Sequence, residues 1–199
     1  DYSHDLMTEE ALNWITANRD QAMFLYLAYC IPHTHWQVPE LGEYAEKDWP
    51  EERFKIQAAM VSRMDRDIGR IKRLLEELGI EEDTLLIFNS DNGAHGQGGT
   101  REFFDTTGGL KGKKRLMTEG GVRSPMLAYW PGKVPAGTHS EHISAFWDFL
   151  PTMAELAGEP INGRTDGLSM LPTLIGEYEQ QKEHRYLYWE LYEGRPNCG

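Results

Sequence analysis

The sequence has few cysteines and no long apolar run. Only Cys30 and Cys198 occur among 199 residues, far apart and outside any C-x-x-C pattern. This excludes a small domain stapled by disulfides. One bridge or two free thiols remain open, and we favour free thiols, with Cys30 packed inside the fold. No stretch approaches the roughly 20 apolar residues that span a bilayer, so no membrane span is predicted.

Positive charge is also scarce. The chain has 20 lysines and arginines against 32 acidic side chains, a formal net charge of -12. Proteins that bind a phosphate backbone usually show a basic face, so we expect no nucleic-acid partner. The N-terminus has neither an initiating Met nor a charged-then-apolar signal segment. We therefore expect these residues to be part of a longer protein.

What is present is enough apolar sequence for a packed core, in alternating strand and helix patterns. Hydrophobic residues make up 40% and aromatic residues 11% of the chain. Buried strands are predicted for residues 22–29, 84–89 and 125–130, with a less clear strand at 186–190. Helices are predicted from about Thr8, over 51–78, and over 147–157. This order predicts an α/β fold, whose sites lie just outside the carboxyl ends of strands.

Asp91 and Asn92 stand at such a strand end, within the sequence Ser-Asp-Asn-Gly. A carboxylate beside an amide oxygen suits a hard cation such as Ca²⁺ or Mg²⁺. The alternative is a tight turn, for which Asp-Asn-Gly is equally suited.

Histidines follow the first predicted strand. His33 and His35 lie two apart, so they share one face if the segment is extended. An imidazole there could bind a metal or act as a general acid, or both could be exposed loop residues.

A basic run interrupts the otherwise acidic chain. Lys111, Lys113, Lys114 and Arg115 fall within five residues, after several glycines that permit close backbone approach. An anion site is one interpretation and a solvated loop the other. A hard cation, an imidazole and an ammonium group that converge on one tetrahedral oxyanion would suit hydrolysis of a sulfate or phosphate ester.

Several of these segments together resemble a known family. They are FLYLA at 24–28 leading to PHT at 32–34, residues 84–93 ending in SDNG, Lys114 with EGGVRSP at 119–125, and WDFLPT at 147–152. In this order, over roughly residues 5–190, the chain resembles the formylglycine-dependent sulfatases of the arylsulfatase type. The resemblance implies an alkaline-phosphatase-like α/β/α sandwich that lacks its N-terminal portion. Residues 1–199 would then be a partial catalytic domain, with core sheet and helices to about 160 and the start of a C-terminal region at 161–199.

The same resemblance implies roles for individual residues. Asp91 and Asn92 would be two ligands of a divalent cation, usually Ca²⁺, with Mg²⁺ as the alternative. His33 would face the sulfate and its leaving-group oxygen, and Lys114 would contact a sulfate oxygen. His95 would line the substrate pocket. The implied substrate is a sulfated small molecule or saccharide, and the implied location is the periplasm or the exterior.

The departures from the family pattern matter as well. The chain has no C-x-P-x-R or S-x-P-x-R segment, whose first residue is oxidised to formylglycine, because Cys30-Ile31-Pro32 is followed by Thr34 where arginine is required. The nucleophile would therefore come from a missing N-terminal portion, and we expect this chain alone to be inactive. A sheet without all its strands exposes an edge, which favours self-association.

Two other functions stay open. One is a metal-dependent phosphodiesterase or phosphonate hydrolase of the same fold. The other is a non-catalytic domain that binds anions or saccharides, which the missing nucleophile favours. The sequence does not choose between aryl and saccharide esters.

Overall fold

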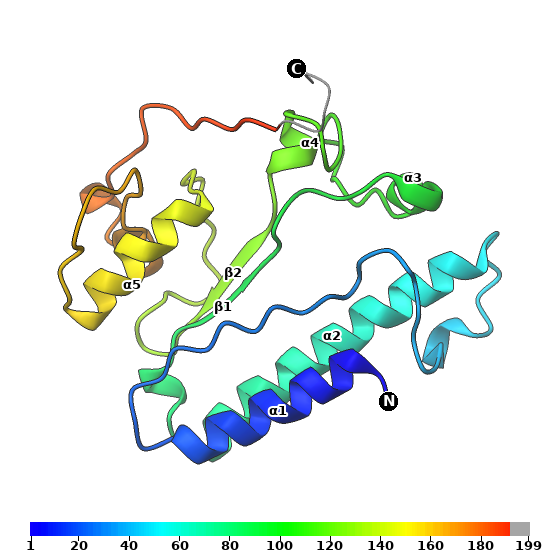
Figure 1. Cartoon of the computed structure of the whole chain (residues 1–199), viewed down its shortest axis with the longest axis horizontal. Helices are drawn as coiled ribbons and strands as arrows, with labels where there is room; N and C mark the ends of the chain where they lie inside the picture. Colours follow the sequence, from blue (N-terminus) through cyan, green and yellow to red (C-terminus); the bar gives the residue numbers. More distant parts are fainter. Residues whose placement is uncertain (192–199) are drawn as a thin grey trace. The chain divides into compact units, whose positions relative to one another are not determined.

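The computed structural model describes residues 1–191 (Figure 1). They fall into two compact units. The first contains residues 1–81 and 90–125, and the second contains 82–89 together with the described residues from 126 onward. Among residues 1–191, no helix combines the length and the apolar character that crossing a bilayer requires.

Two long helices that run in the same direction form the core of the first unit. Figure 1 shows α1 (Ser3–Asn18) and α2 (Glu52–Glu77) side by side, and the contacts between them advance together along both helices. His4 near the start of α1 contacts Asp67, and Glu9 farther along contacts Arg70. Apolar side chains of α2 bury themselves on one face, at Phe54, Ala59, Met60, Ile71 and Leu75. The predicted helix over 51–78 is thus confirmed.

The first helix begins earlier than the sequence predicted. Thr8 was expected near its start, but it lies inside α1 and is completely buried. Its hydroxyl lies 3.0 Å from the carbonyl oxygen of His4 and 2.9 Å from the hydroxyl of Tyr29. The threonine therefore joins α1 to the next segment and does not cap the helix.

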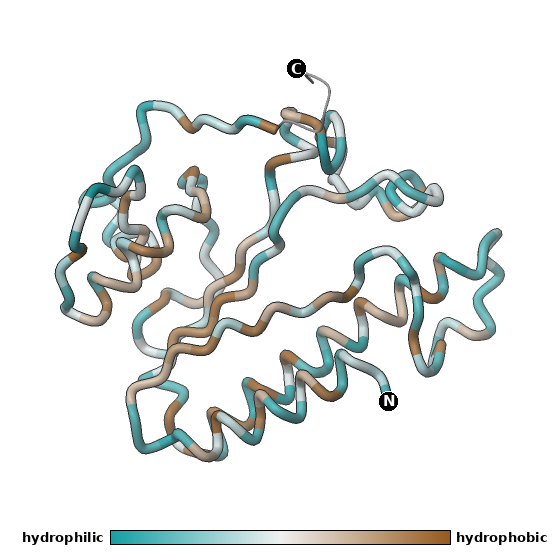
Figure 2. The backbone as a smooth tube through the Cα atoms, viewed as in Figure 1, coloured by the Kyte–Doolittle hydropathy of each residue, from teal (hydrophilic) through white to brown (hydrophobic). Residues whose placement is uncertain are grey.

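The predicted strand at residues 22–29 is wrong. This apolar stretch, visible in Figure 2, is extended but is not assigned as a strand. Phe24 and Tyr26 are 73% and 78% exposed, whereas Tyr29 packs its ring 4.3 Å from that of His4. Two parallel helices need a connection that returns along the first one, and these residues supply it. Leu25, between Phe24 and Tyr26, is exposed as well, so this continuous apolar run is not covered on both sides as a buried strand would be.

Residues 90–125 complete the first unit with short elements. The 3-10 helix η3 (Gln97–Gly99) leads into α3 (Thr100–Phe104), and α4 (Glu119–Val122) follows. Phe103 of α3 stacks on Phe54 of α2 with ring centroids 4.2 Å apart. Two further 3-10 helices flank α2, η1 (Gly42–Tyr44) before it and η2 (Glu81–Asp83) after it.

The second unit contains a two-stranded antiparallel sheet. β1 (Leu86–Asn89) pairs with β2 (Met126–Tyr129), in a register that sets Leu86 opposite Tyr129 and Asn89 opposite Met126. Both strands lie within predicted ones. They are half-buried rather than covered on both faces, and Leu127 is largely exposed.

Helices and a buried carboxylate organise the rest of this unit. The 3-10 helix η4 (Phe146–Asp148) runs into α5 (Phe149–Ala157), which confirms the predicted helix, and α6 (Leu171–Leu174) and η5 (Tyr178–Gln180) follow. Asp148 is fully buried and accepts hydrogen bonds from the amide of Leu168 at 2.7 Å and from His184 at 2.8 Å. The strand predicted at 186–190 is wrong, because these residues are not assigned to a strand and several aromatic side chains there are exposed.

Candidate functional site

The structure brings His33 and Lys114 together, although they lie far apart in the sequence. The Nζ atom of Lys114 is 3.3 Å from Nε2 of His33. His33 sits on a turn whose backbone amide bonds to the carbonyl oxygen of Cys30 at 3.1 Å. Both side chains belong to the first unit. The two side chains therefore meet at one place, where the Lys114 ammonium group has further N–H donors that an oxyanion could accept.

The chemistry of the pair decides which ring nitrogen carries the proton. A lysine ammonium group can only donate, so Nε2 of His33 accepts and the hydrogen of the neutral imidazole is on Nδ1. That nitrogen faces Thr34, 3.2 Å from its hydroxyl oxygen and 3.4 Å from its carbonyl oxygen. Thr34, which stands where the formylglycine motif would require arginine, therefore orients the His33 ring.

His95 lies beside this pair. Burial lowers its pKa below the ordinary histidine value, and repulsion from His33 in its protonated form and from Lys114 lowers it further. Its ring centroid is 5.8 Å from that of Trp36. His95 is therefore neutral at pH 7 and links the His33–Lys114 pair to an aromatic side chain.

Close backbone contacts hold the Lys114 loop against the turn that follows β1. The amide of Gly93 donates to the carbonyl oxygen of Gly121 at 3.0 Å, and the amide of Lys114 donates to that of Ala94 at 2.8 Å. A Cβ atom on Gly93 or Gly121 would overlap with neighbouring carbonyl oxygens, of Gly120 and Leu116 respectively. These glycines thus set the position of Lys114. From the sequence alone, the Glu-Gly-Gly segment at 119–121 indicated only a resemblance to a known family, and not this packing role.

Asp91 and Asn92 lie on the same turn, just before Gly93. The Nδ2 group of Asn92 donates to Oδ1 of Asp91. The second carboxylate oxygen of Asp91 and the amide oxygen of Asn92 are ligand atoms of the kind that hard cations bind. Within residues 1–191, no group of three or more His, Cys, Asp or Glu side chains could hold a metal ion. The two residues fit part of a cation shell, and no complete shell occurs in that range.

Other candidates from the sequence lie outside this arrangement. His35 is exposed, with its backbone at φ 67°. Lys111 is exposed, and the side chain of Lys113 packs against Gly96. Cys30 is a free but exposed thiol, which corrects the expectation that it would be packed, because the turn before His33 turns it outward. Cys198 lies outside the described residues.

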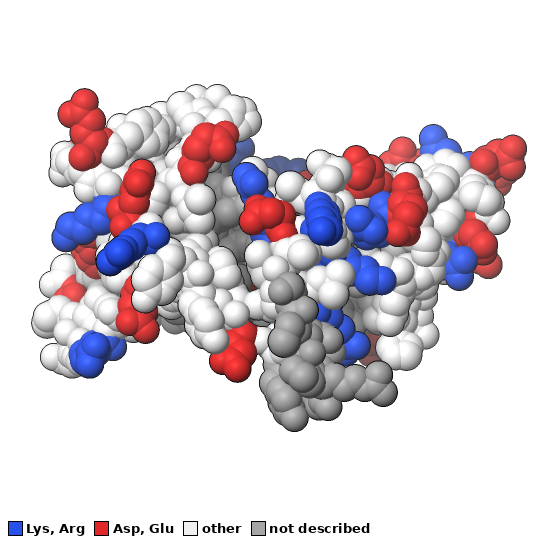
Figure 3. Space-filling model, turned by 90° about the horizontal axis from the view of Figure 1, so that it is seen from above, with Lys and Arg blue, Asp and Glu red and all other residues white. Residues whose placement is uncertain are grey.

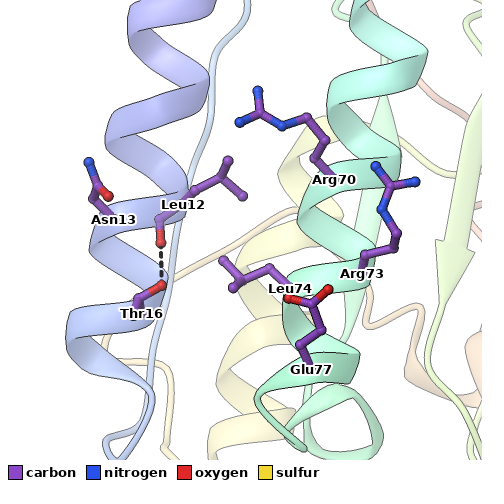
Figure 4. A pocket seen from close by; sticks show the side chains of 7 residues that line it. All are labelled: Leu12, Asn13, Thr16, Arg70, Arg73, Leu74 and Glu77. Carbon is purple, nitrogen blue, oxygen red and sulfur yellow. Dashed lines mark hydrogen bonds between the residues drawn. The ribbon is translucent and has the colours of Figure 1, made fainter.

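A shallow groove lies between α1 and α2, away from these side chains. Its volume is about 300 Å³. Figure 4 shows the side chains that line it: Leu12, Asn13, Thr16, Arg70, Arg73, Leu74 and Glu77. Arg70 already pairs with Glu9 at 2.7 Å. None of the sequence-predicted site residues lines this groove.

The surface charge is mixed. In Figure 3, acidic and basic side chains alternate over the visible face and do not gather into one large field of a single sign. On the face that this view shows, no large field of one sign would attract an anion.

Comparison with known proteins gives a consistent result. A family model described as Sulfatase matches residues 1–159. Arylsulfatase A of Homo sapiens is 32% identical over 188 residues, which cover 94% of this chain and 34% of that protein. N-acetylgalactosamine-6-sulfatase of Canis lupus familiaris is 34% identical over 177 residues, covering 84% of this chain and 32% of that protein. The chain thus spans about a third of the length of these curated relatives.

A solved structure is similar in both sequence and shape. Ps i-CgsB, in complex with k-i-k-neocarrahexaose, is 35% identical to the chain and has a TM-score of 0.78. The match covers 88% of this chain and 39% of that one.

Proposed function

The chain belongs to the sulfatase family and has part of its alkaline-phosphatase-like fold, and from this we propose that the protein containing it hydrolyses sulfate esters. The observation that carries the proposal is the 3.3 Å approach of Lys114 to His33. In an acidic chain, this pair of residues, distant in sequence, offers a local site for a tetrahedral oxyanion.

We assign each residue of the pair a distinct task. Lys114 would hold a non-bridging sulfate oxygen and stabilise the negative charge that develops there. His33 would face the leaving-group oxygen and act in its imidazolium form, giving that oxygen the proton from Nε2 and so returning to the neutral ring with its hydrogen on Nδ1, which is general acid catalysis. Thr34 would keep the His33 ring in place. His95, neutral at pH 7, would line the pocket and bond to the substrate without adding charge.

Asp91 and Asn92 would contribute two oxygen ligands to a divalent cation, Ca²⁺ or Mg²⁺. Such a cation, when bound, withdraws charge from sulfate oxygens. The formylglycine nucleophile would come from residues outside these 199, because the chain has no C-x-P-x-R segment. We further propose that residues up to about 160 belong to the catalytic core and that 161–199 begin a C-terminal region.

The substrate would be a sulfated small molecule or a sulfated saccharide. The complex of Ps i-CgsB with k-i-k-neocarrahexaose supports the saccharide, and the name arylsulfatase A supports the aryl ester.

The test compares the full-length protein with the 199-residue chain on 4-nitrophenyl sulfate and on bis(4-nitrophenyl) phosphate. We expect the full-length protein to cleave the sulfate ester, to lose that activity on chelation, and to regain it with Ca²⁺ or Mg²⁺. The chain alone should be inactive. Preference for the phosphodiester would instead identify a phosphodiesterase, and turnover by the 199-residue chain would disprove the external nucleophile.

A further inference from the structure

The chain contains two Asn-Gly dipeptides in very different surroundings. One is Asn92-Gly93, in the turn that follows β1, and the other is Asn162-Gly163, in the loop between α5 and α6. Glycine has no side chain to shield its amide nitrogen or to restrict its backbone, so an asparagine before glycine is the one most open to attack by its own main chain. The two dipeptides are chemically alike, and their surroundings therefore decide whether either one reacts.

The reaction in question is deamidation. When the glycine amide loses its proton to hydroxide, its nitrogen bonds to Cγ of the asparagine and closes a succinimide ring. The bond between Cγ and Nδ2 breaks, and ammonia leaves with a proton from water, which restores the hydroxide. Water then opens the ring at either carbonyl and gives aspartate or isoaspartate. The reaction thus needs a glycine amide that can lose its proton and a backbone that can turn toward the side chain.

Asn92-Gly93 meets neither requirement. The amide of Gly93, a buried residue, donates its hydrogen to the carbonyl oxygen of Gly121 at 3.0 Å. A Cβ atom on Gly93 would overlap with the carbonyl oxygen of Gly120, so its backbone has no room to turn. The Nδ2 group of Asn92 is also held, because it donates to Oδ1 of Asp91. These contacts keep the proton on the amide and the nitrogen away from Cγ.

Asn162-Gly163 meets both requirements. The two residues are exposed, and a Cβ atom on Gly163 would have no other group within 4 Å. Its backbone, at φ 115°, is in a region that glycine adopts readily. In the part of the chain that the structure describes, no hydrogen bond holds the Gly163 amide or the Asn162 side chain. The amide is therefore open to hydroxide, and the loop is free to turn.

We propose that Asn162 is a site of spontaneous deamidation and that the hydrogen bond from Gly93 to Gly121 protects Asn92 from the same reaction. The proposal goes beyond the proposed function and does not depend on cleavage of a sulfate ester. The product at Asn162 adds a negative charge to an exposed loop, where such a change is tolerated. At Asn92 the reaction would turn an amide ligand into a carboxylate, so the protection keeps the proposed cation site chemically intact.

The test incubates the full-length protein at mildly alkaline pH, folded or in guanidinium chloride, and follows its tryptic peptides by mass spectrometry. The peptides 74–101 and 134–164 contain Asn92 and Asn162 separately, and fragment ions locate each product. In the folded protein, we expect Asn162 to convert and Asn92 to convert at least about tenfold more slowly, because attack there waits for local opening. In guanidinium chloride, the two rates should agree within about twofold, because unfolding removes the protection.

Variants separate the chemistry from the packing. Asn162→Gln, whose longer side chain would have to close a larger ring, should abolish the product in peptide 134–164. Gly121→Ala should speed conversion of Asn92, because the added methyl group overlaps with the carbonyl oxygen of Leu116 and loosens this contact. Gly69→Ala, inside α2 with open space around it, is the matched control and should leave the rate at Asn92 unchanged. Thermal melts verify that each variant folds.

The comparison of folded and unfolded parent protein decides the proposal even if Gly121→Ala does not fold. Equal rates at the two sites in the folded protein would overturn the protection, as would a slow Asn92 that stays slow in guanidinium chloride. An Asn162 that does not react in the folded protein would overturn the modification site.

Discussion

At the scale of single residues, the contact between Lys114 and His33 is the feature most open to test. Lys114→Ala in the full-length protein should lower kcat for a sulfate ester by about 10²- to 10³-fold, as expected when one donor to a developing oxyanion is lost. Steady-state kinetics with 4-nitrophenyl sulfate measures the effect. Lys111→Ala, which removes an exposed charge three residues away, is the control and should retain activity. Similar losses in both variants would mean that the general charge of the loop matters, and not the contact with His33.

The buried pair of His4 and Asp67 makes a second prediction at this scale. Burial lowers the pKa of His4 below 6.5, although Asp67, 3.0 Å away, and Asp5 oppose the shift, and Arg63 adds to it. The unfolded chain thus binds more protons than the folded chain, so stability should fall as the pH drops below 6.5. Burial alone would raise the pKa of Asp67. Bonds from Arg66, Arg70 and His4 outweigh that effect and lower it, so its contribution persists until the pH falls below 3.8.

Urea unfolding of the protein between pH 5 and 8 measures this dependence. In the variant His4→Gln, the part of the pH dependence that lies just below pH 6.5 should disappear. An unchanged slope in that range would show that another group titrates on unfolding.

At the scale of elements, the glycines behind the Lys114 loop fix how two chain segments meet. Gly121→Ala should destabilise the protein by about 1–3 kcal/mol, because the added methyl group overlaps with the backbone of Leu116. Gly69→Ala is the matched control, since it lies inside α2 with open space around it, and it should stabilise by about 0.5–1 kcal/mol. Chemical denaturation compares the two. A Gly121→Ala protein as stable as the parent would contradict the close packing.

How well an element could be predicted depends on whether its own residues determine it. The helix over 51–78 was predictable, because its periodic apolar stripe makes it amphipathic wherever it packs. Residues 22–29 were not, since a short apolar run does not reveal whether another strand lies beside it. Thr8 illustrates a further ambiguity. Its hydroxyl can cap a helix or, as here, join two buried segments.

The candidate site divides in the same way. His33, Lys114 and the Asp91–Asn92 pair were recognisable because they sit in motifs with fixed spacing. Trp36 was not singled out, because its ring contact with His95 joins residues far apart in the sequence, which a sequence pattern does not display.

At the scale of the whole molecule, the exposed apolar segment should govern how the 199-residue chain behaves in solution. Phe24 and Tyr26 are 73% and 78% exposed on neighbouring outward positions of an extended stretch. Exposed extended segments of this kind pair readily with other chains. We expect the isolated chain to self-associate, and the double variant Phe24→Ser, Tyr26→Ser to shift it toward the monomer. Light scattering after gel filtration measures the mass, and a monomeric parent at all concentrations would contradict the prediction.

The pairing of Asn89 with Met126 has a wider consequence, because residues 90–125 leave β1 and re-enter β2 at directly opposed positions. Such a segment can change in length or composition while its anchor points stay fixed, since the entropy of closing a loop grows only slowly with length. Its replacement by the corresponding stretch of a relative would leave the strand register intact. Because the same segment carries Asp91, Asn92, His95 and Lys114, variation in length that keeps the register would be confined to the stretches between these residues.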